Sequence, residues 1–174
     1  MTHESSNQLE IAVRRATPAD APTILQVHGD SVRGLGAPYY HAEVSDRWAK
    51  APTPEQIEPF QRAIASEEEV MHVAIVGDRV AGYSSLMPDP QTDDENLVGM
   101  YIHPSVARRG AATALLCALE SHAHHLGITR LSLRSSIVAE PFYLAKGYRV
   151  TGRSEITGTP GAQLDFVRME KDIG

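Results

Sequence analysis

The residues with the clearest chemical meaning form one segment, where a predicted strand turns into a helix. It holds two arginines, a glycine and three small residues: Arg108, Arg109, Gly110, Ala111, Ala112 and Thr113. The first amides of a helix lack intrahelical partners and carry partial positive charge, and glycine lets a backbone approach an anion closely. Because cations at a helix start oppose its dipole, a bound anion explains the arginines best. We predict a phosphate-binding site here.

The same segment differs from two common nucleotide-binding motifs. It lacks the Gly-Lys-Ser/Thr ending of a P-loop and the three glycines of a dinucleotide fingerprint. A nucleotide-binding protein is therefore a weak hypothesis, and ATP and NAD fit poorly.

Other reactive side chains give weaker signals. Of the three histidines His122, His124 and His125, only the first and last share a helix face, and no carboxylate or thiol stands at matching spacing. We predict solvent-facing histidines and no metal site. The single cysteine, Cys117, is flanked by alanine and leucine, which predicts a small buried side chain.

The elements that must position the phosphate-binding segment alternate between strands and helices. Thr17 and Pro18 start one helix, Thr53 and Pro54 start another, and an apolar stripe predicts a long helix from Ala112 to a glycine cap at Gly127. Apolar and polar residues alternate at 9–15, which predicts a strand. Short segments bounded by turn residues predict further strands at 70–76, 80–87, 97–102, 130–135, 148–156 and 163–170. The predicted strands at 70–76 and 80–87 form a hairpin. The order indicates a mixed sheet covered by helices.

Size and charge bound the function. A chain of 174 residues suits one domain, and we expect a disordered tail at 1–8 and a single domain at 9–172. A net charge of -6 argues against nucleic-acid binding, which needs clustered cations. We expect no membrane insertion, because no apolar run approaches about 20 residues. The first residues do not resemble a secretory signal, so we expect a cytoplasmic protein.

Two motifs in this order resemble the GNAT superfamily of acetyl-CoA-dependent N-acetyltransferases. That family binds the CoA pyrophosphate with Gln/Arg-x-x-Gly-x-Gly/Ala, after a strand that ends in an apolar-aromatic-apolar triplet and proline. Residues 100–104 (MYIHP) and 109–112 (RGAA) match this layout, although Ala107 replaces the first Gln/Arg. Residues 139–148 (AEPFYLAKGY) are similar to the family's A-x-x-F-Y-x-x-x-G-F/Y segment. The resemblance runs from about residue 9 to 171 and weakens between 34 and 66.

The resemblance implies an α/β (or α+β) fold: a splayed, mostly antiparallel mixed sheet of about six to seven strands, with helices on both faces. It implies acetyl-CoA as acetyl donor and no metal. The pantetheine arm would lie along the strand that precedes the turn, and Ser136 takes the place of an asparagine that often contacts this arm. The residues expected to contact acetyl-CoA are Met100, Tyr101, Ile102, Arg108, Arg109, Gly110, Ala111, Ala112, Thr113, Ser136, Ala139, Phe142 and Tyr143.

The resemblance also implies catalytic roles. Tyr143 would act as general acid toward the departing sulfur, and a backbone N–H near Met100 would polarise the thioester carbonyl. The glutamate that serves several relatives as base falls on Asn96. Glu95 is a candidate, although strand alternation points it to the opposite face. The other candidates for the base are a water chain and the side chains of His103, His41 and Glu43.

The function expected is acetyl transfer to a primary amine of a small molecule or peptide, by direct attack in a ternary complex. The alternative is a non-catalytic acyl-CoA-binding sensor or regulatory module. Its partners would be acetyl-CoA and the amine, without nucleic acid or membrane, and homodimers are common in the family. Three aromatic residues, Tyr39, Tyr40 and Trp48, either line an acceptor pocket or pack beneath it.

Overall fold

The structure is a computed structural model that describes residues 10–36, 51–66, 69–88, 96–159 and 162–174, and the single positions 38, 43, 46 and 49. The tail predicted at 1–8 lies outside these residues. The described helices are α1 (Ala21–Gly36), α3 (Pro54–Ser66), α4 (Ala111–His125) and α5 (Glu140–Ala145), with short 3-10 helices η1 (Pro18–Asp20) and η2 (Pro104–Val106). The strands are β1 (Ile11–Arg15), β2 (Val70–Val76), β3 (Arg79–Pro88), β4 (Asn96–Ile102), β5 (Arg130–Ser136), β6 (Arg149–Thr159) and β7 (Ala162–Asp172).

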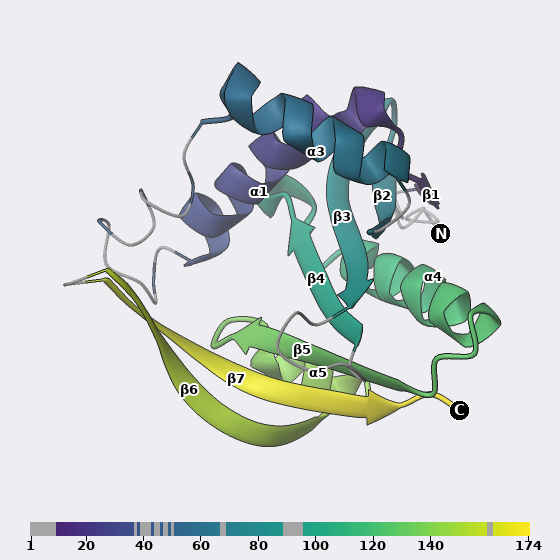
Figure 1. The fold of residues 1–174 in the computed structure, drawn as a ribbon, viewed down its shortest axis with the longest axis vertical. Helices are drawn as coiled ribbons and strands as arrows, with labels where there is room; N and C mark the ends of the chain where they lie inside the picture. The colour runs from purple at the N-terminus through teal and green to yellow at the C-terminus, as the bar shows by residue number, and fades with distance from the viewer. Residues whose placement is uncertain are drawn as a thin grey trace, which may run out of the picture.

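These strands form one seven-stranded sheet in the order β1-β2-β3-β4-β5-β7-β6 (Figure 1). Every neighbouring pair is antiparallel except β4 and β5. That parallel pairing is short, with Leu97 opposite Ser132 and Val98 opposite Leu133. The predicted mixed, mostly antiparallel and splayed sheet is therefore confirmed.

Helices cover both faces of the sheet. On one face, α1 and α3 bury Ile24 and Ile64 against Val73 and Tyr83. On the other face, α4 and α5 pack Leu116 and Tyr143 into a second core with residues of β4, β5 and β7. The predicted hairpin of β2 and β3 turns at Gly77, whose φ of 65° is a conformation that glycine adopts without strain.

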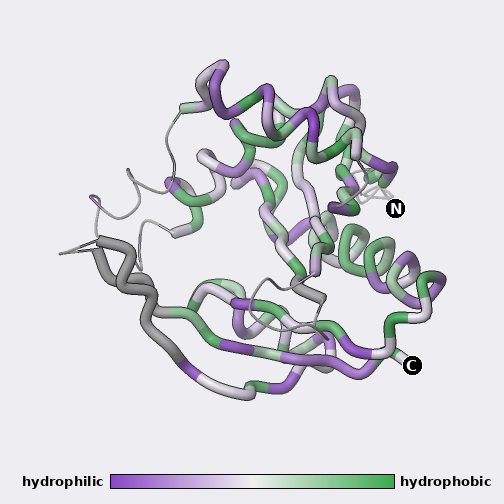
Figure 2. Tube along the Cα trace, in the orientation of Figure 1, coloured by the Kyte–Doolittle hydropathy of each residue, from purple (hydrophilic) through white to green (hydrophobic). Residues whose placement is uncertain are grey.

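The apolar stripe of α4 holds the helix against the sheet. Its buried residues are Ala111, Leu115, Leu116, Leu119 and Ala123, and Figure 2 shows green and purple segments alternating along α4. The prediction for Cys117 was wrong, because its side chain is exposed. One residue advances a helix by about 100°, which turns position 117 away from the stripe that position 116 joins.

Candidate functional site

The site begins where β4 and β5 separate. After Val98 and Leu133, β4 continues beside β3 as far as Ile102, and β5 continues beside β7 as far as Ser136. Figure 1 shows the two strands diverging from this junction. A pocket of about 510 Å³ lies at the opening, with residues of both strands in its wall.

The diverging stretch of β4 presents backbone groups to this opening. The amide of His103 donates to the carbonyl of Ala81 on β3, at 2.8 Å. In an antiparallel ladder the direction of the backbone groups alternates from residue to residue. The backbone N–H and C=O groups of Tyr101 and Gly99 therefore also point toward β3. Those of Met100 and Ile102 point toward the opening. A ligand in the pocket can pair with β4 as an added strand would.

Five segments line the pocket: the end of α1, β4, the turn before α4 with the first residues of that helix, the end of β5, and α5 with the two residues before it. Of the residues predicted to contact acetyl-CoA, those that line it are Met100, Tyr101, Ile102, Arg108, Gly110, Ala112, Thr113, Ser136, Ala139, Phe142 and Tyr143. Arg109 and Ala111 do not line it. Ala111 is only 1% exposed because, at the start of α4, it packs against the sheet, and Arg109 is exposed outside the pocket.

Several lining residues were missed by the sequence analysis. The end of α1 contributes Ser31, Val32, Leu35 and Gly36. Their helical spacing is also that of an ordinary core-facing stripe, so nothing in the sequence marks them as pocket residues. Arg134 of β5 lines the pocket as well and, with Arg108, gives its wall positive charge suited to an anionic ligand.

The turn before α4 leaves the first amides of that helix without carbonyl partners. Gly110 caps the helix with φ 97°, and Arg108 has φ 61°, a left-handed conformation that is uncommon for a residue with a side chain. The first amide of the helix to find a carbonyl is that of Ala114, which donates to Gly110 at 3.0 Å. The preceding amides, of Ala111, Ala112 and Thr113, have no intrahelical partner. They lie at a positive helix end beside the pocket.

Tyr143 lies in the wall of the pocket on α5. Its ring makes edge contacts with Phe142 and Tyr148, at centroid distances of 5.2 and 5.4 Å, and only 4% of the residue is exposed. Behind it, the Tyr148 hydroxyl donates to Glu120 at 3.2 Å, and Lys171 bonds both oxygens of the same carboxylate at 2.9 Å. Burial raises the pKa of Tyr143, so this phenol is protonated at neutral pH.

Aromatic rings also cover β4 on the face that α1 covers. The rings of Tyr101 and Tyr83 stack at a centroid distance of 5.4 Å, and His28 of α1 makes an edge contact with Tyr101 at 4.4 Å. Burial lowers the pKa of His28, so this imidazole is neutral at pH 7. This face is distinct from the one that holds Tyr143, which packs with α4.

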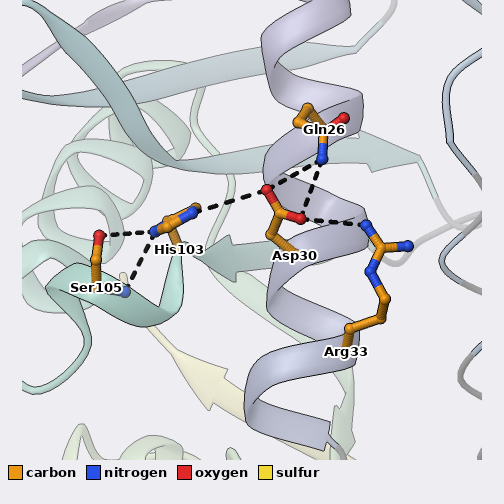
Figure 3. Close-up of polar contacts among 5 residues, drawn as sticks. All are labelled: Gln26, Asp30, Arg33, His103 and Ser105. Carbon is orange, nitrogen blue, oxygen red and sulfur yellow. Dashed lines mark hydrogen bonds and ion pairs between the residues drawn. The ribbon is translucent and has the colours of Figure 1, made fainter.

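His103 was a candidate base, and Figure 3 shows that other residues hold its ring. The Ser105 amide donates to His103 Nδ1 at 3.2 Å, and the Ser105 hydroxyl lies 2.7 Å from the same nitrogen. In the neutral ring the proton is therefore on Nε2, which lies 3.7 Å from Asp30. The Nδ1 lone pair is occupied, and His103 does not line the pocket.

Of the other side-chain candidates for the base, only one falls among the described residues. Glu95 and His41 lie outside the described residues, as do Tyr39, Tyr40 and Trp48, and Glu43 is an exposed isolated position. In the described part of the chain, no group of three or more His, Cys, Asp or Glu residues could hold a metal ion. No helix among the described residues is long and apolar enough to span a membrane.

A mixed, mostly antiparallel sheet that opens at one parallel junction, with a glycine-capped helix start beside the opening, is the arrangement of an acetyltransferase-type fold. A family profile described as an acetyltransferase (GNAT) domain matches residues 37–173. The chain belongs to the GNAT acetyltransferase family.

Solved structures agree with this assignment. The GCN5-related N-acetyltransferase from Rhodopseudomonas palustris is 25% identical, with a TM-score of 0.79 over 94% of this chain and 97% of its own. The PaiA N-acetyltransferase from Thermoplasma acidophilum, solved with coenzyme A, is 20% identical, with a TM-score of 0.73 over 94% and 99%. The YncA protein from Salmonella typhimurium, solved with its cofactor acetyl-CoA, is 18% identical, with a TM-score of 0.73 over 95% of each chain. A search of curated proteins finds no match.

Proposed function

We propose that residues 9–172 form one acetyl-CoA-dependent N-acetyltransferase domain, which moves an acetyl group to a primary amine of a small molecule or peptide in a ternary complex. The observation that carries this proposal is that one pocket joins the unpaired backbone of β4 to the free amides that begin α4. An extended arm that ends in a pyrophosphate needs both features. Two structural neighbours contain coenzyme A or acetyl-CoA.

The residues fit acetyl-CoA in a definite order along the pocket. The amides of residues 111–113, with the guanidinium of Arg108, suit the pyrophosphate. The backbone groups of Met100 and Ile102 suit the amide groups of the pantetheine arm, while Ser136 and Phe142 form the opposite wall. When bound, acetyl-CoA supplies an activated thioester, and the Met100 N–H would stabilise negative charge on its carbonyl oxygen.

Tyr143 is the proposed acid. The amine nitrogen bonds to the carbonyl carbon, the C–S bond breaks, and the sulfur needs a proton or a hydrogen bond. An ordinary tyrosine pKa lies about 1.5 units above that of a thiol, so complete transfer would cost about 2 kcal/mol. Burial raises the pKa of Tyr143 and increases that cost. We infer that Tyr143 stabilises the sulfur chiefly by a hydrogen bond as the C–S bond breaks.

The alternative function, acyl-CoA binding without turnover, is favoured by two lining positions. Ala107 lacks the charged or amide side chain of the family motif, and Ser136 is shorter than the asparagine often found there. Tyr143 favours catalysis, because a binding module has no need of a hydroxyl beside the sulfur.

A thiol-release assay with acetyl-CoA and a panel of amines tests the proposal, with mass spectrometry of the amine as the second readout. We expect amine-dependent release of coenzyme A and one acetyl group added to the amine. A reaction without amine controls for thioester hydrolysis. Saturable binding of acetyl-CoA without turnover on any amine would support the binding module instead.

A further inference from the structure

Glu69, directly before β2, is a carboxylate that has no role in the proposal so far. It bonds to the hydroxyl of Ser85, which lies on β3 and is only 4% exposed. Ser85 stands opposite Met71 of β2 and opposite Gly99 of β4. Glu69, Ser85 and Gly99 therefore follow one another across the sheet toward the opening beside β4.

Gly99 connects this row to the pocket. It lines the pocket one residue before Met100. A Cβ at position 99 would lie 2.8 Å from Ser85 Oγ, closer than real Cβ contacts. Because glycine has no side chain, the Ser85 hydroxyl occupies that space and lies against the backbone that borders the pocket.

The row lies on the face that α1 and α3 cover. Met71, two residues after Glu69, packs into the core on this face, and the stacked rings of Tyr83 and Tyr101 form the next row of the same face. Tyr143 packs on the opposite face with α4. An acid on one face of the sheet and a base on the other would keep the proton removed from the amine apart from the hydrogen bond given to the sulfur.

The charge state of Glu69 suits a base. Burial raises the pKa of its carboxyl, although the Ser85 hydrogen bond opposes this effect. Among the described residues, Glu69 interacts with Ser85 and with Tyr83, whose pKa burial raises well above its ordinary value. Neither neighbour is a cation that would hold the carboxylate in its charged form, and a carboxylate with a raised pKa is a better proton acceptor than an exposed one.

We propose that Glu69 accepts the proton that the acceptor ammonium must lose, through Ser85 and a water molecule at Gly99. This inference rests on the proposed function. The N–H bond of the ammonium breaks and its proton passes to the Glu69 carboxylate, which later returns it to solvent. The neutral amine forms the N–C bond as the C–S bond breaks. The nitrogen loses its second proton to solvent, and the departing sulfur, held by the Tyr143 hydrogen bond, takes a proton from solvent to leave as the thiol.

The test compares E69Q with wild type in profiles of kcat/KM against pH from 5 to 10. The matched control is E58Q, because Glu58 is exposed on α3 and pairs with Arg62. Near pH 7 we expect E69Q to lose about tenfold or more in kcat/KM, with acetyl-CoA affinity within about twofold of wild type. The loss of kcat/KM in E69Q relative to wild type should become smaller toward pH 10, where solvent removes the proton from the amine. A loss of the same size at every pH, or no loss, would overturn the proposal.

Two further measurements keep the proposal testable if E69Q folds poorly. Glu69→Asp keeps the carboxylate and should retain the acidic limb of the profile. In wild type, a carbon-13 NMR titration should show that the Glu69 carboxyl has a pKa above its ordinary value, and that this pKa changes when coenzyme A fills the pocket. An unshifted titration overturns the assignment. Failure of wild type to acetylate any amine overturns both this inference and the proposed function, whereas normal turnover with an unaffected E69Q overturns only the role of Glu69.

Discussion

Val98 of β4 and Leu133 of β5 form the last pair that holds these two strands together. Beyond this pair, Met100 and Ile102 stay in register with β3 but have no partner strand on the β5 side, where they line a pocket beside the start of α4. One short parallel pairing therefore creates both the space and the hydrogen-bonding groups on which the proposed acetyl-CoA site depends.

Removing the Tyr143 hydroxyl tests the proposed acid. Tyr143→Phe should lower kcat by about tenfold or more while acetyl-CoA affinity stays within about twofold, because the hydrogen bond to sulfur forms mainly as the C–S bond breaks. Steady-state kinetics and calorimetry provide the two readouts. Tyr148→Phe is the control, since it removes a hydroxyl that bonds Glu120 and lies outside the pocket lining. Unchanged turnover in Tyr143→Phe would contradict the assignment.

The glycine that caps α4 separates backbone strain from ligand binding. Gly110 and Gly77 both have positive φ, and an added Cβ at either position meets no atom closer than 3.7 Å. Alanine at either position should therefore cost about 1 kcal/mol in the free energy of unfolding. Only Gly110→Ala should also weaken acetyl-CoA binding, as measured by calorimetry, because it disturbs the amides that face the pocket. Equal affinities in the two variants would argue against phosphate binding at this turn.

The close approach of Ser85 to Gly99 predicts a coupled pair of substitutions. Gly99→Ala should destabilise the protein by about 1 to 3 kcal/mol, because its Cβ would overlap Ser85 Oγ. Ser85→Ala removes that oxygen, so the double variant should recover part of the loss. Denaturant unfolding of the four proteins gives the interaction free energy. Additive effects would show that the two positions are not in contact.

His72 predicts loss of stability in acid. Burial, with Arg15 and His122 nearby, lowers its pKa to about 4, and its Nδ1 has no hydrogen-bond partner in the described structure. The unfolded chain binds a proton at His72 more readily than the folded chain does. Neutral His72 therefore contributes fully to the free energy of unfolding above about pH 6.5, and this contribution is lost as the pH falls toward 4.

Between pH 7 and pH 5, His72 should account for about 2 kcal/mol of lost stability. His72→Gln should reduce the difference between denaturant unfolding curves at these two pH values. His124→Gln, at an exposed position of the same helix that carries His122, should leave the difference unchanged. An equal acid sensitivity in wild type and His72→Gln would refute the prediction.

Local patterns in the sequence predicted much of the fold and the position of the turn that begins α4. The stripe of α4, the hairpin at Gly77 and the start of α4 at Gly110 depend on neighbours within a few residues. The Ser85–Gly99 contact depends on the register of β3 and β4, which is not a local property of the sequence, and it could not be predicted from spacing. The α1 wall of the pocket was missed because residues that line a pocket and residues that fill a core share the same helical spacing.

A crystal structure with coenzyme A bound tests the central claim most directly. The account predicts that the pantetheine arm pairs with the backbone of Met100 and Ile102, and that the pyrophosphate lies within hydrogen-bond distance of the amides of Ala111, Ala112 and Thr113. Coenzyme A bound elsewhere, or bound without contact to either set of backbone groups, would contradict it.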